Sequence, residues 1–139
     1  MPERDDVARE AWLLMSEFVY GNNRRRAVAD ALGMSFGRSR ALRRLARRPM
    51  SMRELADALG IEAPNATVVV DDLEAQGLVR RRAHPTDRRA KVVEATRKGK
   101  ELARRADEIL ATPPAALSAL SAEDLEALRS VLARARKPE

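Results

Sequence analysis

A capping box followed by two short helical segments is the feature that most restricts how this chain can fold. Ser51 and Glu54 lie three residues apart, so the side chain of each can accept a hydrogen bond from the other's backbone amide and start a helix. That helix ends at Gly60, a residue suited to the left-handed conformation after a helix. Pro64 suits the first turn of a second helix, which ends near Gly77. Two helices joined by a short glycine-containing turn predict a helix-turn-helix.

A basic hairpin follows the second helix directly. Residues 78–83 and 90–95 are strand-like, and the intervening His-Pro-Thr-Asp-Arg stretch at 84–88 has the composition of a turn. A hairpin at this point in the chain is a wing. The expected fold class is therefore mainly α with a small β-hairpin wing, and residues 34–98 form a winged helix-turn-helix.

Amphipathic helices are predicted on both sides of this region. Apolar residues recur at helical spacing near both ends of the chain, and Ser121 begins a capping pattern for the last helix. We expect one domain over residues 1–139, in which residues 5–32 and 99–136 form a helical dimerisation region. The winged domain does not need both terminal stripes to close its own core, so they are expected to pack across a two-fold axis.

Charge and composition favour a nucleic-acid partner. The chain has 27 Lys and Arg against 21 Asp and Glu, a net charge of +6, which favours a polyanion. Aromatic residues make up only 3% of the chain, which argues against single-strand binders that stack bases on exposed rings. No apolar run is long enough to cross a bilayer and the start does not resemble a signal peptide, so no membrane partner and a cytoplasmic location are expected.

Enzymatic and metal chemistry are poorly supported. The chain has no cysteine, and its one histidine, His84, falls in the predicted hairpin turn. Zinc sites need several His or Cys ligands, and no phosphate-binding glycine loop is present. We therefore expect no catalytic residues, no cofactor and no metal site.

From Leu45 to Leu102 the chain resembles the MarR (multiple antibiotic resistance regulator) family of winged helix-turn-helix transcriptional regulators. Residues 52–61 are similar to the family's first DNA-domain helix and turn, and residues 71–81 to the end of its recognition helix and first wing strand. The resemblance implies a homodimer that binds a pseudo-palindromic operator in double-stranded DNA and acts as a repressor released by a small-molecule effector. The family's wing signature, Asp-x-Arg then Thr-x-x-Gly-x-x-Leu, stands here as Asp87, Arg89, Thr96, Gly99 and Leu102.

The resemblance and the positions of the basic residues along the chain together indicate which residues contact DNA. Arg89 at the wing tip would enter a minor groove, with Asp87 bridging to it as wing support, whereas the alternative is a simple surface ion pair. Arginines between residues 36 and 49 would contact phosphates, or else form a solvated helix side. The expected DNA-binding residues are Arg43, Arg47, Arg53, Asn65, Thr67, Val68, Arg80, Arg82, Arg88, Arg89 and Lys91.

The predicted recognition helix departs from the family pattern, which commonly has arginine where this chain has Val68 and Asp72. Asn65 can bind adenine, and the methyl groups of Thr67 or Val68 can contact a thymine methyl. Asp71 and Asp72 would repel phosphates, so we expect the first half of the helix to lie deepest and specificity to depend partly on DNA shape. The alternative is that Val68 is buried and the acids face arginines elsewhere.

Two further interpretations remain open. One is a pocket for a small aromatic or apolar effector, although such residues also form ordinary core or dimer interface. The other is an alternative function, in which the chain is a winged-helix protein-interaction module or a basic RNA-binding protein and does not bind DNA sequence-specifically. Against RNA, the major groove of an A-form duplex is too deep and narrow to read. The candidate pocket residues are Trp12, Met15, Phe18, Phe36 and Met50.

Overall fold

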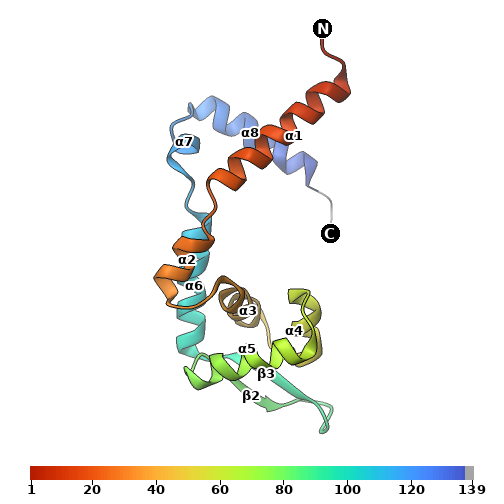
Figure 1. Ribbon diagram of the computed structural model, residues 1–139, viewed down its shortest axis with the longest axis vertical. Helices are drawn as coiled ribbons and strands as arrows, with labels where there is room; N and C mark the ends of the chain where they lie inside the picture. Colours follow the sequence, from red (N-terminus) through yellow and green to blue (C-terminus); the bar gives the residue numbers. More distant parts are fainter. Residues whose placement is uncertain (137–139) are drawn as a thin grey trace.

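A computed structural model describes residues 1–136 as a mainly helical protein with a small three-stranded antiparallel sheet (Figure 1). This agrees with the predicted fold class. In chain order the first elements are α1 (Arg4–Gly21), α2 (Arg25–Leu32), α3 (Phe36–Arg47), β1 (Met50–Ser51), α4 (Met52–Leu59) and α5 (Ala63–Ala75). They are followed by β2 (Val79–Ala83), β3 (Lys91–Ala95), α6 (Arg97–Ala111), α7 (Ala115–Ser118) and α8 (Ala122–Ala135).

The elements divide into two parts. The winged body, residues 25–111, holds α2 to α6 and the sheet, with α5, β2 and β3 at its far end (Figure 1). The terminal helices α1, α7 and α8 lie at the opposite end of the molecule, where α1 crosses α8. Helix α6 leads from the sheet toward them, so it connects the two parts.

The helix-turn-helix begins and ends as its sequence predicts. The Ser51 side chain accepts a hydrogen bond from the Glu54 amide at 3.1 Å, and the Glu54 carboxylate accepts one from the Ser51 amide at 3.2 Å. Gly60 ends α4 with φ of 67°, the left-handed conformation expected of it. The capping box and the glycine stop are both confirmed.

The core of the winged body consists mainly of aliphatic side chains from several elements. Leu42 and Leu45 of α3, Leu55 of α4 and Leu73 of α5 are almost fully buried, and Leu78 joins them just before β2. Burial of one such side chain contributes about 1.5–3 kcal/mol. The body therefore closes around a core of its own.

The sheet contains one strand that the sequence did not reveal. The predicted hairpin is confirmed as β2 and β3, but β1 adds a third strand, with Met50 opposite Val93. A two-residue strand is too short for an alternating pattern. Met50 is buried in the core, which is the alternative to an effector pocket that the sequence leaves open for it.

Gly99 marks a close approach between α6 and the backbone ahead of β2. A Cβ atom at this position would lie 2.0 Å from the Leu78 carbonyl oxygen, which also accepts a hydrogen bond from the Thr96 amide at 2.9 Å. Only a residue without a side chain fits here. The glycine of the wing signature therefore has a packing role.

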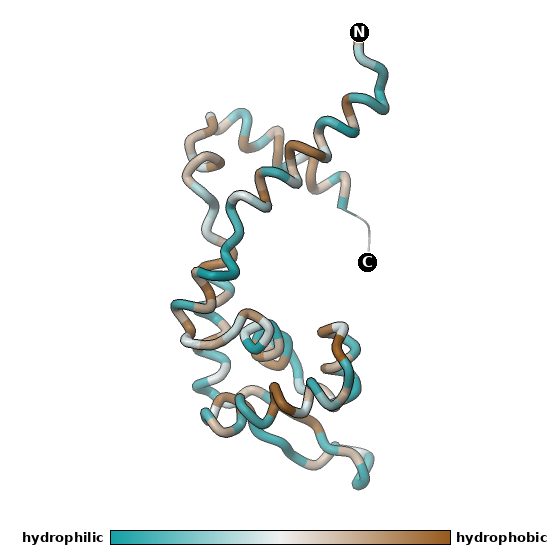
Figure 2. The backbone as a smooth tube through the Cα atoms, viewed as in Figure 1, coloured by the Kyte–Doolittle hydropathy of each residue, from teal (hydrophilic) through white to brown (hydrophobic). Residues whose placement is uncertain are grey.

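The terminal helices contain no buried residue. Apolar stretches nevertheless run along α1 and α8 (Figure 2), and Trp12 is 66% exposed. The short helix α7 was not predicted, because Pro113 and Pro114 indicate a break and one helical turn has no periodicity of its own. No helix within residues 1–136 is long and apolar enough to span a bilayer.

Candidate nucleic-acid interface

Helix α5 lies at the far end of the winged body, with the hairpin beside it (Figure 1). Ala66, Val70 and Leu73 are buried against the core. The opposite side exposes Asn65, Thr67 and Val68, and Val68 is 55% exposed. This side of α5 is therefore free to meet a partner, as the first of the two sequence interpretations expects.

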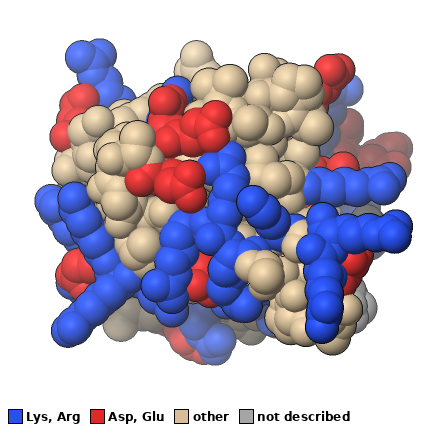
Figure 3. All heavy atoms as spheres, turned by 90° about the horizontal axis from the view of Figure 1, so that it is seen from below, with Lys and Arg blue, Asp and Glu red and all other residues tan. Residues whose placement is uncertain are grey.

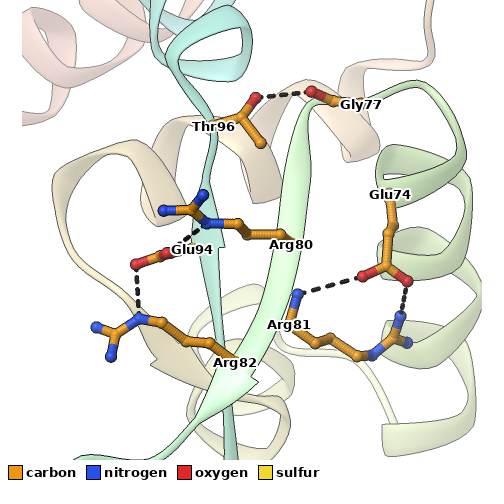
Figure 4. A network of polar contacts seen from close by, with 7 residues as sticks. All are labelled: Glu74, Gly77, Arg80, Arg81, Arg82, Glu94 and Thr96. Atoms are coloured by element: carbon orange, nitrogen blue, oxygen red, sulfur yellow. Dashed lines mark hydrogen bonds and ion pairs between the residues drawn. The ribbon is translucent and has the colours of Figure 1, made fainter.

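Two acids in the second half of α5 are held by an arginine of β2. The Arg81 side chain donates to Glu74 at 2.7 Å, and its backbone amide donates to the same carboxylate at 3.2 Å (Figure 4). The side chain also donates to Asp71 at 2.6 Å. Asp71 first, and then Glu74, raise the pKa of the Arg81 guanidinium. These bonds join the wing strand to the helix.

Asp72 is paired in a similar way, with an arginine from α3. The Arg38 side chain donates to Asp72 from Nε at 2.9 Å and also from its terminal nitrogen. The second sequence interpretation is thus right about the acids, which do face arginines, and wrong about Val68, which is exposed.

Two arginines of the wing share one carboxylate. Arg80 and Arg82 point to the same side of β2 and donate to Glu94 of β3 at 2.6 and 2.7 Å (Figure 4). The arginines, Arg80 first, lower the pKa of Glu94. Glu94 did not emerge from the sequence, although its place opposite Arg80 follows once the hairpin register is known.

Asp87 supports the loop of the wing, but not by the contact expected. Its carboxylate accepts a hydrogen bond from the Arg89 backbone amide at 3.0 Å, so it shapes the turn and leaves the guanidinium unrestrained. His84 also stabilises the turn, because its Nδ1 accepts from the amides of Thr86 and Asp87 at 3.2 and 3.1 Å. The expected bridge from Asp87 to the Arg89 side chain is therefore corrected to a backbone contact.

The remaining basic candidates differ in whether their side chains form an ion pair. Arg43 donates to Asp107 of α6 at 2.5 Å, so this pair packs α3 against α6. Arg47 at the end of α3 and Arg53 on α4 are exposed. So are Arg88, Arg89 and Lys91 on the wing, and none of these five forms an ion pair with another residue of the described range 1–136.

Basic side chains dominate this end of the molecule. Seen from below, Lys and Arg spread over much of the face, with carboxylates gathered in smaller groups among them (Figure 3). The acids of α5 and the sheet are engaged by Arg38, Arg80, Arg81 and Arg82, as described above. The exposed candidate cations without an ion pair lie on the wing, at Arg88, Arg89 and Lys91, and on α3 and α4, at Arg47 and Arg53.

Comparison with known proteins agrees with this geometry. The model of the MarR family matches residues 32–90, which span the helix-turn-helix and most of the wing. The transcriptional regulator BldR from Sulfolobus solfataricus is 28% identical, with a TM-score of 0.62 over 96% of this chain and 99% of BldR. Residues 32–90 of this chain thus match the MarR family model, and the fold is that of MarR-like winged-helix regulators.

Two further MarR-like structures have the same fold. Wild-type MarR from E. coli is 18% identical, with a TM-score of 0.70 over 90% of this chain and 97% of that one. A mutant of MepR from S. aureus, bound to an oligodeoxyribonucleotide, is 20% identical, with a TM-score of 0.64 over 90% of this chain and 94% of MepR. The match extends over both parts of the chain.

The MarR-like architecture brings some of the predicted effector-pocket residues together. Trp12 and Met15 of α1 and Phe36 of α3 line one cavity of about 600 Å³, which Tyr20 also borders. The side chain of Arg25 stacks over the Phe36 ring at 5.1 Å. Phe18 lies instead in a neighbouring groove between the terminal helices.

Metal-binding side chains do not gather in the part of the chain that the structure describes. Within residues 1–136, no group of three or more His, Asp or Glu is arranged to hold an ion.

Proposed function

We propose that this chain is a homodimeric transcriptional regulator that binds double-stranded DNA sequence-specifically. The observation that carries the proposal is the free side of α5 beside a wing whose cations, Arg88, Arg89 and Lys91, are exposed and form no ion pair within residues 1–136. A helix of this kind enters a major groove, and a basic wing reaches the adjacent minor groove. The MepR mutant structure bound to an oligodeoxyribonucleotide supports the same assignment.

The arginines divide into two roles in this proposal. Arg89 enters the minor groove, where narrow A·T-rich tracts concentrate negative potential. Arg47, Arg53 and Arg88 contact phosphates and position the protein without reading sequence. Arg80 and Arg82 share Glu94, so together they bring less net charge to the backbone than two free arginines.

The homodimer forms through the terminal helices. Apolar side chains of α1, α7 and α8 line a groove of about 450 Å³, and Leu14, Leu117 and Leu128 are among them. Exposed apolar surface of this kind is costly in water and marks a protein interface. A two-fold dimer would present two copies of α5 to the half-sites of a pseudo-palindromic operator.

An effector would act from the cavity beside α1. Its lining of Trp12, Met15 and Phe36 suits a small aromatic or apolar molecule. Because this cavity joins α1 to the winged body, its occupant can change how the two parts are arranged. We propose that such a molecule releases the protein from DNA, which makes the chain a repressor.

A comparison of two arginine variants tests the DNA-binding roles. Arg89→Ala should weaken binding to a selected duplex by about 1–3 kcal/mol and reduce the preference for A·T-rich flanks. Arg47→Ala should weaken all duplexes about equally and lower the salt slope by about one unit. Both variants are titrated on one selected and one scrambled duplex across a salt series.

The control is Arg129→Ala on α8, which removes an exposed arginine at the opposite end of the molecule from α5 and the wing and should leave both titrations unchanged. A chain that retains no duplex DNA at any salt concentration contradicts the proposal. Binding only to a protein partner would then favour the protein-interaction alternative, and preference for duplex RNA would favour the RNA-binding one.

A further inference from the structure

The exposed first half of α5 presents methyl groups in place of charge. Val68 is 55% exposed, so its apolar side chain is accessible to a partner on this surface. The Thr67 hydroxyl donates to the Ala63 carbonyl one turn earlier, at 3.1 Å. Because that bond uses the one hydrogen of the hydroxyl, Thr67 has no donor left for a base, and its methyl is the apolar group that it adds to this surface.

Helix α5 also lacks the side chains that usually read guanine. Residues 63–75 contain no Lys or Arg, and residues 63–70 contain no charged residue at all. The acids that follow are held by Arg81 and Arg38, away from the first half of the helix. Arginine or lysine contact with guanine O6 and N7 is therefore not available from this helix.

We infer that α5 recognises the 5-methyl group of pyrimidine bases in the major groove, through Thr67 and Val68. The thymine methyl is the apolar group that an unmodified major groove displays, and apolar side chains contact it. A 5-methylcytosine carries the same group at the same position. This inference rests on the proposed DNA binding and adds the chemical feature that the helix selects.

The location of the two residues supports this assignment. Pro64 and Asn65 precede them in the first turns, the part of a recognition helix that lies closest to the base edges. The exposed Asn65 amide can bind an adenine next to the methylated base. The wing cations supply the attraction to phosphate that α5 itself lacks.

Removing the methyl group from the DNA tests the inference directly. Duplexes retained by the full-length chain from a random pool are remade with deoxyuridine at the thymines common to the selected sequences. Affinity should fall about fourfold for each contacted methyl, since one buried carbon contributes about 0.8 kcal/mol. As a control, the same number of thymines is replaced outside the common positions, where affinity should not change.

Protein variants then locate the contact. Val68→Ala should weaken binding to the thymine duplex and have no further effect on the deoxyuridine duplex, as expected for two groups that touch. Thr67→Ser deletes the methyl and keeps the hydroxyl, so it should weaken binding. Thr67→Val keeps the methyl and removes the hydroxyl, so it should bind at least as well as the unmodified chain.

A second substitution in the DNA extends the test to cytosine. With cytosine at a contacted position, 5-methylation should strengthen binding by about the same fourfold factor. Equal affinity for the thymine and deoxyuridine duplexes overturns the inference and leaves DNA binding intact. Loss of binding in Thr67→Val but not in Thr67→Ser also overturns it, because the hydroxyl would then be the reading group. A chain that retains no duplex overturns the proposed function as well.

Discussion

The winged body and the terminal helices are built from similar apolar residues, yet only the body buries them. Leu42, Leu55 and Leu73 are inaccessible in the core, whereas Leu13 and Leu14 of α1 are 56% and 58% exposed. The body has a sheet and several helices around one core, and the terminal helices have no layer to cover them. The body therefore closes its core within one chain, while the apolar side chains of the terminal helices stay uncovered, and we propose that a second copy covers them.

The largest effect is expected from a charge placed in the groove between the terminal helices. Leu14→Asp should raise the dissociation constant of the dimer at least about a hundredfold, because burying an unpaired carboxylate in the interface has a large unfavourable free energy. Sedimentation equilibrium at micromolar concentrations measures this shift. Leu13→Asp is the control, since Leu13 is as exposed as Leu14 but does not line the groove. Equal disruption by both variants would mean that the groove is not the interface.

A smaller effect is expected inside the winged body. Gly99→Ala forces a Cβ against the Leu78 carbonyl and should lower the free energy of unfolding by about 1–3 kcal/mol. Gly37→Ala, on α3, meets nothing within 4 Å and should raise it by about 0.4–1 kcal/mol. Urea denaturation of the two variants compares them. If Gly99→Ala were as stable as Gly37→Ala, the close approach of α6 to residue 78 would be wrong.

The smallest expected effect is on folding stability, and it depends on pH. It compares one carboxylate of the winged body with one of the terminal helices. Arg80 and Arg82 lower the pKa of Glu94, which is 15% exposed, and Arg129 lowers the pKa of Glu126, which is 64% exposed. A lowered pKa stabilises the folded state above the ordinary value of about 4.5, and this contribution disappears as the pH falls through the folded-state pKa.

Glu94→Gln should therefore lower the urea midpoint of unfolding at neutral pH. The difference in midpoint between this variant and the unmodified chain should become smaller as the pH falls below about 4.5. Glu126→Gln should leave the midpoint unchanged, because solvent screens an exposed pair within one helix. A difference for Glu94→Gln that widened in acid would contradict the pairing with Arg80 and Arg82.

Much of the fold can be predicted from the sequence because its signals are local. The capping box at Ser51, the stop at Gly60 and the hairpin composition each involve neighbouring residues, and all appear in the structure. The strand at Met50 could not be predicted, because its two residues acquire an extended partner only when β3 folds against them.

The candidate site is less predictable because its polar contacts join distant residues. Arg38 meets Asp72 across 34 residues, and Arg43 meets Asp107 across 64. Neither pair has a signal in spacing or periodicity. The sequence therefore shows six arginines between 36 and 49 without revealing which of them form ion pairs with distant carboxylates. The exposure of Val68 likewise follows from how α5 packs, which the short apolar run at 68–70 leaves undecided.

The bonds of Arg81 have a consequence for how binding energy is used. Three hydrogen bonds from Arg81 hold the wing to α5, and Arg38 holds α5 to α3. We expect these bonds to hold α3, α5 and the wing in one arrangement, so that little conformational entropy is lost when the body docks as proposed. On this view the winged body binds DNA as one unit. In the proposed dimer, an effector therefore changes operator affinity through one variable, the separation and relative orientation of the two bodies.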